Sequence, residues 1–205
     1  MRASLEKLPV IAAGEFLRGK LEMIETTRLC LRRWVEGDRE PFAALNSDSR
    51  VMEFMPGCLS RVESDLLLDR LERQFDERGF GLYAAELREQ HLFVGFAGLS
   101  IPNFEAHFTP CVEIGWRLNT DSWGRGLATE AAKAIVEVAF GPMQIEALVS
   151  FTVPTNVRSR RVMEKIGLRH DPADDFDHPN LLQDHPLRRH VLYRIHRSEW
   201  TGEKR

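Results

Sequence analysis

Residues 112–130 read VEIGWRLNTDSWGRGLATE and combine a strand, a glycine-containing turn and the start of a helix. The apolar stretch 112–118 predicts the strand, and the helix predicted from Gly126 extends to about Phe140. Gly124 and Gly126 let the turn adopt conformations that a side chain would block, and let the backbone approach a ligand closely. The first turn of a helix has unpaired N–H groups and the positive end of the helix dipole. The turn is therefore suited to bind phosphate or pyrophosphate.

A second segment, NVRSRRVMEKIGL at residues 156–168, begins thirty residues after the second glycine. Its pattern predicts a helix over residues 156–165 that ends just before Gly167. In this order and spacing, the two segments resemble the GCN5-related N-acetyltransferase (GNAT) family, which transfers an acetyl group from acetyl-coenzyme A (acetyl-CoA) to an amine. The loop WGxGxATE and the opening TRLCLR of residues 27–32 are similar to the branch that acetylates the N-termini of ribosomal proteins. The resemblance covers roughly residues 24–197.

The glycine turn differs from other nucleotide-binding loops. The pattern Gly124-x-Gly126-x-x-Thr129 lacks the third glycine of a Rossmann fingerprint, and no acidic residue ends the next strand, where a ribose would need one. No Gly-Lys-Ser/Thr is present, which excludes a P-loop. Gly126 and Ala128 match the GNAT loop Gln/Arg-x-x-Gly-x-Gly/Ala, while Trp123 replaces its first residue, which mainly supplies backbone. For the loop alone, an ordinary strand-to-helix turn is the alternative.

Hydrophobic periodicity along the chain predicts an α/β protein with a mixed sheet. The expected strands are residues 28–33, 81–87, 92–100, 112–118, 146–152 and 190–196, and the expected helices are residues 38–46, 64–78, 126–140 and 156–165. Residues 102–110 and 171–187 are expected to be loops. The crossover helix 126–140 predicts that its flanking strands pair in parallel. The resemblance implies a GNAT-like acyl-CoA N-acyltransferase fold: a central, mostly antiparallel sheet, that parallel pair splayed apart, and helices on both faces.

The composition is that of a soluble globular domain, with 205 residues, 43% hydrophobic and 29% charged residues, and a net charge of −3. We expect residues 23–200 to form one N-acetyltransferase domain and residues 1–22 to be an N-terminal extension that is disordered or contacts a partner. The negative charge argues against nucleic acid as a partner. No apolar run approaches the roughly 18 residues of a membrane span. Three scattered cysteines form no disulfide framework, which favours a cytoplasmic location.

The resemblance implies a site for acetyl-CoA around the glycine turn. Backbone N–H groups of residues 124–129 would hold the pyrophosphate, and one N–H among residues 117–119 would face the thioester oxygen. Asn156 would bind the pantetheine amides, although asparagine is also a good helix N-cap. Arg161 would meet a phosphate or lie on a solvated helix face. The residues expected to bind the co-substrate are Leu118, Asn119, Gly124, Arg125, Gly126, Leu127, Ala128, Thr129, Asn156 and Arg161.

Acetyl transfer to an amine needs a base, because an alkylamine with a pKa of ~10 is mostly protonated at neutral pH. Glu113 lies where the family often carries a catalytic carboxylate, and partial desolvation would raise its pKa toward that task. The alternative is a solvated carboxylate, or one paired with an arginine. Many relatives have a tyrosine at the position of Met163, where it protonates the leaving thiolate. Here Ser159 is the candidate for that role, or it only positions the sulfur.

Residues 170–196 hold five of the seven histidines, with aspartates among them. Their spacings match no standard ligand set, so we expect no metal and interpret this segment as part of the acceptor pocket. Neither motif contains a cysteine that could carry the acyl group, which favours direct attack in a ternary complex. The expected acceptor is a protein N-terminus or a small amine, and monomer and homodimer both remain open. The alternative, supported by Met163, is a catalytically weak CoA-binding sensor of the same fold.

Overall fold

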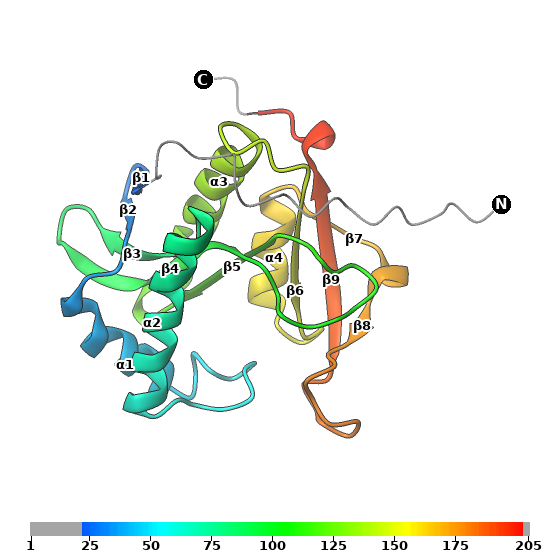
Figure 1. Ribbon diagram of the computed structural model, residues 1–205, viewed down its shortest axis with the longest axis horizontal. Helices are drawn as coiled ribbons and strands as arrows, with labels where there is room; N and C mark the ends of the chain where they lie inside the picture. Colours follow the sequence, from blue (N-terminus) through cyan, green and yellow to red (C-terminus); the bar gives the residue numbers. More distant parts are fainter. Residues whose placement is uncertain (1–21, 203–205) are drawn as a thin grey trace.

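The computed structural model describes residues 22–202, arranged as a central sheet with helices on both faces (Figure 1). The strands are β1 (Met23–Glu25), β2 (Leu29–Arg32), β3 (Leu82–Leu87), β4 (Leu92–Ser100), β5 (Glu113–Leu118), β6 (Ala147–Thr152), β7 (Arg169–His170), β8 (Phe176–Asp177) and β9 (Arg189–His196). The α-helices are α1 (Arg39–Ser47), α2 (Arg61–Arg78), α3 (Leu127–Phe140) and α4 (Val157–Lys165). Our interpretation of residues 1–22 falls outside the described residues except for Glu22.

The sheet confirms the predicted fold class. Its strand order is β1-β2-β3-β4-β5-β6-β9-β7, with β8 paired to β9. Within residues 22–202, every strand pairing is antiparallel except that of β5 with β6, the two strands that the crossover helix α3 connects. The parallel pair shares a single register position, Glu113 opposite Val149, and the N–H of Val149 donates to the carbonyl of Val112 at 2.9 Å. The first residue of β5 therefore pairs with the middle of β6, and the two strands part beyond that point.

Three short strands and the start of one helix differ from the sequence prediction, and the ends of several other elements differ by one residue. The strands β1, β7 and β8 were not predicted, because runs of two or three residues are too short for alternation to be read. Helix α2 begins at Arg61 rather than Ser64. Ser60 and Glu63 form a capping box there: the Ser60 hydroxyl accepts from the Glu63 N–H, and the Glu63 carboxylate accepts from the Ser60 N–H.

Two apolar clusters form the core. In the larger cluster, Phe42 of α1 packs edge-on against Trp34, with ring centroids 4.8 Å apart, and also contacts Phe96 of β4. On the other face, α3 contributes small buried alanines, which let the helix lie close to the sheet. The smaller cluster joins β6, β8 and β9 to the connection 101–112, which passes in front of those strands in Figure 1. The smaller cluster thus lies against β6, β8 and β9, while the larger cluster includes residues of β6 and β9 as well as of β4 and β5.

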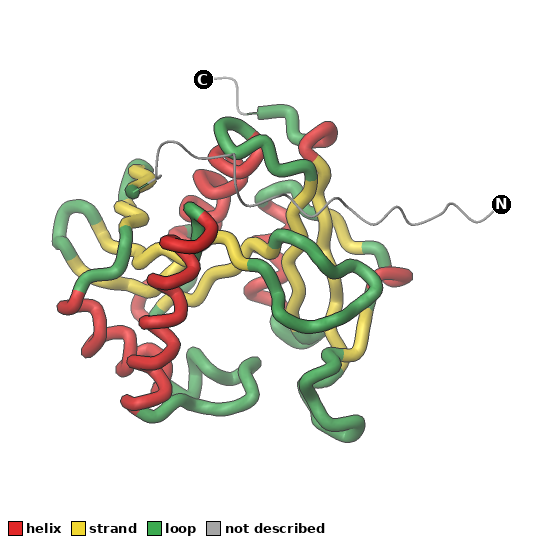
Figure 2. Tube along the Cα trace, in the orientation of Figure 1, coloured by secondary structure: helices red, strands yellow, loops and turns green. Residues whose placement is uncertain are grey.

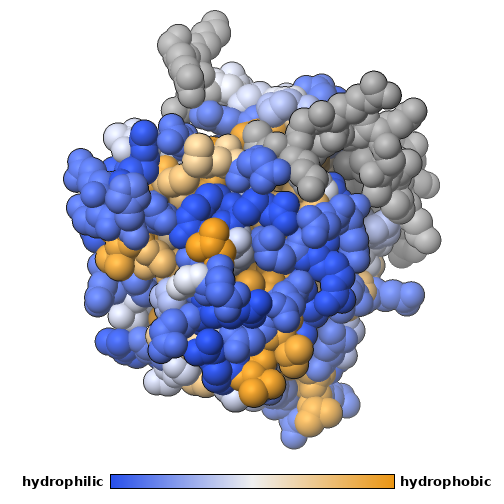
Figure 3. All heavy atoms as spheres, turned by 60° about the vertical axis from the view of Figure 1, so that its left-hand side comes forward, coloured by the Kyte–Doolittle hydropathy of each residue, from blue (hydrophilic) through white to orange (hydrophobic). Residues whose placement is uncertain are grey.

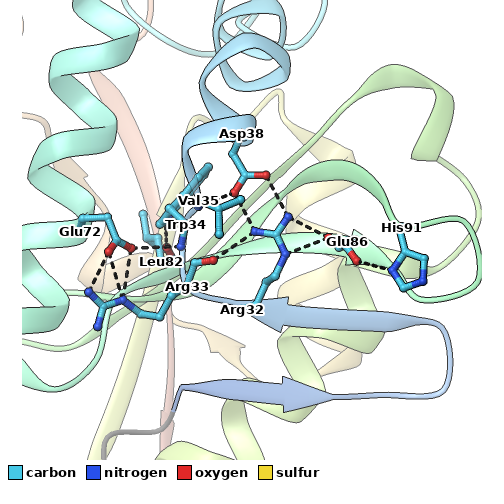
Figure 4. A network of polar contacts seen from close by, with 9 residues as sticks. All are labelled: Arg32, Arg33, Trp34, Val35, Asp38, Glu72, Leu82, Glu86 and His91. Atoms are coloured by element: carbon cyan, nitrogen blue, oxygen red, sulfur yellow. Dashed lines mark hydrogen bonds and ion pairs between the residues drawn. The ribbon is translucent and has the colours of Figure 1, made fainter.

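A network of charged side chains fixes α1 and α2 to the edge of the sheet (Figure 4). The Arg32 guanidinium forms a fork on Asp38, with N–O distances of 2.7 and 2.9 Å, and also pairs with Glu86 of β3. Next to it, Arg33 pairs with Glu72 of α2 at 2.7 Å. Bidentate Arg–carboxylate pairs define orientation well. The network therefore sets where α2 and the turn that leads into α1 lie over the sheet.

Two irregular connections, residues 48–60 and 178–188, lie at the lower edge of the molecule in Figure 2, on either side of the parallel pair.

The face in Figure 3 is mostly hydrophilic, and its hydrophobic colour is confined to separate patches. Among the helices of residues 22–202, none combines the length and apolarity that crossing a membrane requires.

Candidate active site

The glycine turn has the backbone conformation that the sequence predicted. Gly124 and Gly126 have φ values of +72° and +79°, in the left-handed region that side chains disfavour. Gly126 is the N-cap of α3 and has no side chain to cap the helix, so the first N–H groups of α3 have no side-chain acceptor there. These groups are those of Leu127, Ala128 and Thr129. The turn can therefore present several donors and the helix dipole to an anion.

Three residues that the sequence analysis did not select as site residues stabilise this turn through hydrogen bonds and an ion pair. The Arg28 guanidinium donates to the carbonyl of Arg125 at 2.9 Å and pairs with Glu130 at 2.6 Å. The Thr26 hydroxyl donates to the same Glu130 carboxylate at 2.6 Å. Burial alone would raise the pKa of Glu130, but these hydrogen bonds lower it, so the carboxylate is ionised at neutral pH. The connection between β1 and β2 thus fixes the glycine turn against α3.

Backbone hydrogen bonds narrow the choice of donor for the thioester oxygen. The N–H of Asn119 donates to the carbonyl of Val94 in β4 at 2.9 Å, so it is already used. In an antiparallel ladder, successive residues point their N–H groups to opposite edges of the strand. The N–H of Leu118 therefore faces away from β4, toward the side where β5 and β6 part. The Leu118 carbonyl accepts from the Trp123 indole at 2.8 Å, which fixes the end of the strand.

A pocket of about 330 Å³ lies along this part of β5. The predicted site residues that line it are Leu118, Gly124, Gly126, Leu127, Ala128, Thr129, Asn156, Ser159 and Arg161. Asn119, Arg125 and Glu113 are not on its lining. The segment joining α1 to α2 contributes Val51 and Met55, which no motif had indicated. A larger cavity, about 510 Å³, lies at the carboxyl-terminal ends of α3 and α4 and contains none of the predicted site residues.

Helix α4 presents its first turn to the pocket. Asn156 is the N-cap, as the alternative interpretation expected: its side-chain oxygen accepts from the Ser159 N–H at 3.2 Å. Its amide nitrogen donates to the Thr152 hydroxyl at 3.0 Å. Ser159 is partly buried beside it. Met163, one turn further on, is 1% exposed and packs in the main core.

The arginines of α4 have different surroundings. Arg160 points away from the pocket and donates to the Tyr193 hydroxyl and the Pro154 carbonyl. The Arg158 guanidinium lies 4.1 Å from the Trp123 ring centroid and pairs with Glu53 at 3.1 Å. Arg161 is exposed at the pocket rim. Arg158 thus ties α4 both to the glycine turn and to the segment 48–60.

Glu113 lies at the point where β5 and β6 separate. It is partly buried, and within residues 22–202 its side chain has one hydrogen bond, which the Ser100 hydroxyl donates to the carboxylate at 3.0 Å. Burial raises the pKa of Glu113 to about 7, although the Ser100 hydrogen bond opposes the rise. Among residues 22–202, no arginine or lysine forms an ion pair with Glu113. The carboxyl is therefore close to half ionised at neutral pH, the condition in which a general base is most effective.

The histidine-rich segment is held mainly by its own contacts. His170 bonds Asp175 at 2.7 Å, and Asp174 pairs with Arg194 at 3.1 Å. His178 and His190 lie 5.2 Å apart within an aromatic cluster, and burial lowers the pKa of both imidazoles. Among the described residues, no three His, Cys, Asp or Glu side chains are grouped as a metal site would need.

A model of the Acetyltransferase (GNAT) domain matches residues 28–169. The chain belongs to the GNAT family. It is 30% identical over 149 residues to the uncharacterized N-acetyltransferase YnaD of Bacillus subtilis, which covers 72% of this chain and 83% of the relative. An acetyltransferase of the same family from Bacillus anthracis superposes with a TM-score of 0.71 at 25% identity, covering 86% of this chain and 99% of that one.

A further solved structure with the same fold contains bound coenzyme A. It is RimL, a ribosomal L7/L12 α-N-protein acetyltransferase in complex with coenzyme A, with a TM-score of 0.69, 16% identity, and coverage of 85% of this chain and 98% of that one. RimL shows the shared fold. Membership of the GNAT family, together with the N-acetyltransferase relative, makes this protein an acetyl-CoA-dependent acyltransferase, as the sequence predicted. The left-handed glycine turn, the uncapped start of α3 and the pocket along β5 fit a coenzyme A molecule.

Proposed function

We propose that this GNAT enzyme transfers the acetyl group of acetyl-CoA to a primary amine, a protein N-terminus or a small amine, by direct attack in a ternary complex. The observation that carries the proposal is Glu113. It is a carboxyl with a pKa of about 7, placed where the parallel strands part. Acetyl-CoA supplies an activated acetyl group as a thioester. The remaining requirements are to hold it, polarise its carbonyl and deprotonate the amine.

The glycine turn and α3 are assigned to the pyrophosphate. Their donors are the N–H groups of residues 124–129, and the ion pair of Arg28 with Glu130 keeps the turn in place. Arg161 at the pocket rim adds a cation that can meet a phosphate. The side-chain oxygen of Asn156 caps α4, and its amide nitrogen donates one hydrogen bond to Thr152. Its proposed contact with pantetheine therefore uses the second N–H of the amide or the second lone pair of the oxygen.

Glu113 is assigned to the amine. An alkylammonium with a pKa of ~10 has to lose a proton before its nitrogen can attack. The carboxylate of Glu113 accepts that proton, directly or through one water, and the Ser100 hydroxyl orients the carboxylate. The N–H of Leu118 is assigned to the thioester oxygen, where it stabilises the negative charge that develops during attack.

Ser159 is assigned to the leaving sulfur. Its position in the first turn of α4 places it on the pocket, whereas Met163 is buried and has no proton to donate. A serine hydroxyl is a weak acid, so its contribution is a hydrogen bond that orients the thiolate or relays a proton from water.

The cysteines favour direct attack over an acyl-enzyme. Burial, together with the nearby charge of Glu113, raises the pKa of Cys111 to about 12, which leaves almost no thiolate at neutral pH. Burial also raises the pKa of Cys30 on β2. Cys58 is exposed and is not on the pocket lining.

The test is release of free thiol from acetyl-CoA in the presence of amines. We expect release with peptides that have a free N-terminus or with small amines, no release with the same peptides N-terminally blocked, and one acetylated product per thiol. Intact-protein mass spectrometry after incubation with acetyl-CoA alone should show no covalent acetyl adduct. A stable adduct on the protein would contradict direct attack.

The double variant Glu113→Gln, Ser159→Ala is the control for the sensor alternative. It should still bind acetyl-CoA, measured by calorimetry, and release no thiol above background. If the wild type itself binds acetyl-CoA but releases no thiol with any amine, the protein is a CoA-binding module and the proposed function is wrong.

A further inference from the structure

Arg117 is a cation on the strand that carries Glu113. The two residues are four apart on β5, so their side chains lie on the same face of the sheet. Gly115 lies between them on that face, and a Cβ built there would meet no atom within 4 Å. The surface of β5 between Glu113 and Arg117 is therefore open. Arg117 also lines the pocket that contains Ser159 and the glycine turn.

The guanidinium of Arg117 is surrounded by neutral groups. One nitrogen donates to the side-chain oxygen of Asn46 at 2.6 Å, and another contacts the Met55 sulfur at 3.2 Å. Its carbon lies 5.2 Å from the centroid of the Phe96 ring. Among residues 22–202, no carboxylate forms an ion pair with Arg117. Burial lowers the pKa of Arg117 to about 10, which still leaves it charged at neutral pH.

This environment differs from that of a structural arginine in the same chain. Arg32 is also partly buried, and it is neutralised by two carboxylates, those of Asp38 and Glu86. A buried cation that has only neutral partners has lost hydration without gaining a counter-charge. The attraction between such a cation and a bound anion is stronger than at an exposed site, because the surrounding dielectric is low.

We propose that Arg117 binds a carboxylate of the acceptor, so that the enzyme prefers amines that carry an acidic group a few bonds from the nitrogen. This inference rests on the proposed function, since it takes Glu113 as the group that receives the amine. The Cα atoms of Glu113 and Arg117 are about 13 Å apart along the strand. The side chains of Glu113 and Arg117 cover part of this distance. An acceptor whose amine and carboxylate are a few bonds apart covers the rest, and it would lie over the open surface at Gly115. A peptide whose first or second residue is Asp or Glu has this form.

The test compares matched peptides that begin with Asp or Glu against the same peptides with Asn or Gln. For the wild type, we expect kcat/KM to be about tenfold higher for the acidic member of each pair, the gain from one charge-assisted contact. In Arg117→Met the preference should fall to about one, while kcat/KM for the amide peptides changes little.

Asn46→Asp is a second variant that keeps Arg117 in place. It puts a carboxylate of the same shape where the Asn46 oxygen now accepts from the guanidinium. The new carboxylate at position 46 then forms an ion pair with Arg117, so the preference for acidic over amide peptides should also disappear. Asn46 also donates to the Ser64 hydroxyl at 2.9 Å, and in the variant that hydroxyl can donate instead.

Three results would overturn the inference. The first is equal kcat/KM for acidic and amide peptides in the wild type. The second is an equal loss for both peptide types in Arg117→Met, which would make Arg117 purely structural. The third is a weaker affinity for CoA in that variant with the peptide preference unchanged, which would assign Arg117 to the phosphates of CoA.

Calorimetry of peptide binding to the CoA-loaded protein separates this inference from the proposed function. If no thiol is released but the acidic peptide binds more tightly than its amide partner, and only when Arg117 is present, Arg117 is a carboxylate site and the transfer reaction is wrong. If neither peptide binds the CoA-loaded protein, the inference about Arg117 is wrong.

Discussion

Replacing Glu113 with Gln changes stability and activity in opposite directions. In the folded protein, burial raises the pKa of Glu113 from its ordinary value of 4.5 to about 7. The folded state therefore binds the proton more tightly than the unfolded chain does. The stability that this group contributes is fully present below about pH 4.5, falls as the pH rises, and is lost above about pH 7. At 1.36 kcal/mol per pKa unit, the loss is at most about 3 kcal/mol.

Gln has nearly the same shape and no titrating proton, so the variant lacks this loss. We expect the free energy of unfolding of Glu113→Gln, relative to the wild type, to increase by about 2–3 kcal/mol between pH 4.5 and pH 8. Urea unfolding at both pH values measures it. Glu130→Gln is the matched control, because the pKa of Glu130 is lowered in the folded state. Its stability relative to the wild type should change little between pH 4.5 and pH 8, and should rise only as the pH falls below about 4.5, where the wild type loses the contribution of the ionised carboxylate.

Activity gives the second measurement on the same variant. In the wild type, kcat/KM should rise with pH through an inflection near 7, as Glu113 becomes ionised. In Glu113→Gln that inflection should be absent and kcat/KM should fall by roughly 10²–10⁴-fold. A variant that keeps the inflection near 7, or that gains no stability at pH 8, would show that Glu113 is neither the base nor a buried carboxyl with a raised pKa.

Three further predictions concern the co-substrate site. Gly126→Asp should raise the dissociation constant for CoA at least about tenfold in calorimetry, because it forces a side chain into φ +79° and puts a carboxylate where phosphates are expected; an unchanged constant would remove the turn from the site. Arg28→Met should raise KM for acetyl-CoA and leave kcat at saturation nearly unchanged, because it loosens the turn without touching the reacting atoms, and a loss confined to kcat would refute that role. Asn156→Ala should cost about 1 kcal/mol in urea unfolding through loss of the α4 cap, whereas Asn156→Ser should cost much less; equal costs would mean that the cap is not the source.

The parts of the fold that could be predicted from the sequence are those with strong local patterns. The continuous apolar run of β4, the alternation along β5, the helical spacing in α3 and the glycines at 124 and 126 are patterns within a few neighbouring residues. The crossover between β5 and β6 follows from chain connectivity, so the one parallel pairing was predictable too. β7 and β8 were not, because two residues carry no readable period.

The candidate site divides in the same way. Glu113, Ser159 and the turn were selected as candidates because they lie in two short motifs, and their roles stay predictions. Their supports were missed because each depends on a contact between distant parts of the chain. Arg28 reaches Glu130 across 102 residues, and Arg117 reaches Asn46 across 71. The two motifs contain residues of opposite charge, Arg28 and Glu130, which was a visible signal of an ion pair. Charge alone, however, does not show which acidic residue an arginine contacts.

The most direct test of the central claim is a crystal structure of the enzyme with coenzyme A. The account predicts the pyrophosphate against the N–H groups of residues 124–129, the pantetheine arm along β5 beside Leu118, and the sulfur between Glu113 and Ser159. Coenzyme A bound in the larger cavity at the ends of α3 and α4, or with its sulfur remote from Glu113, would contradict the assignment of the active site.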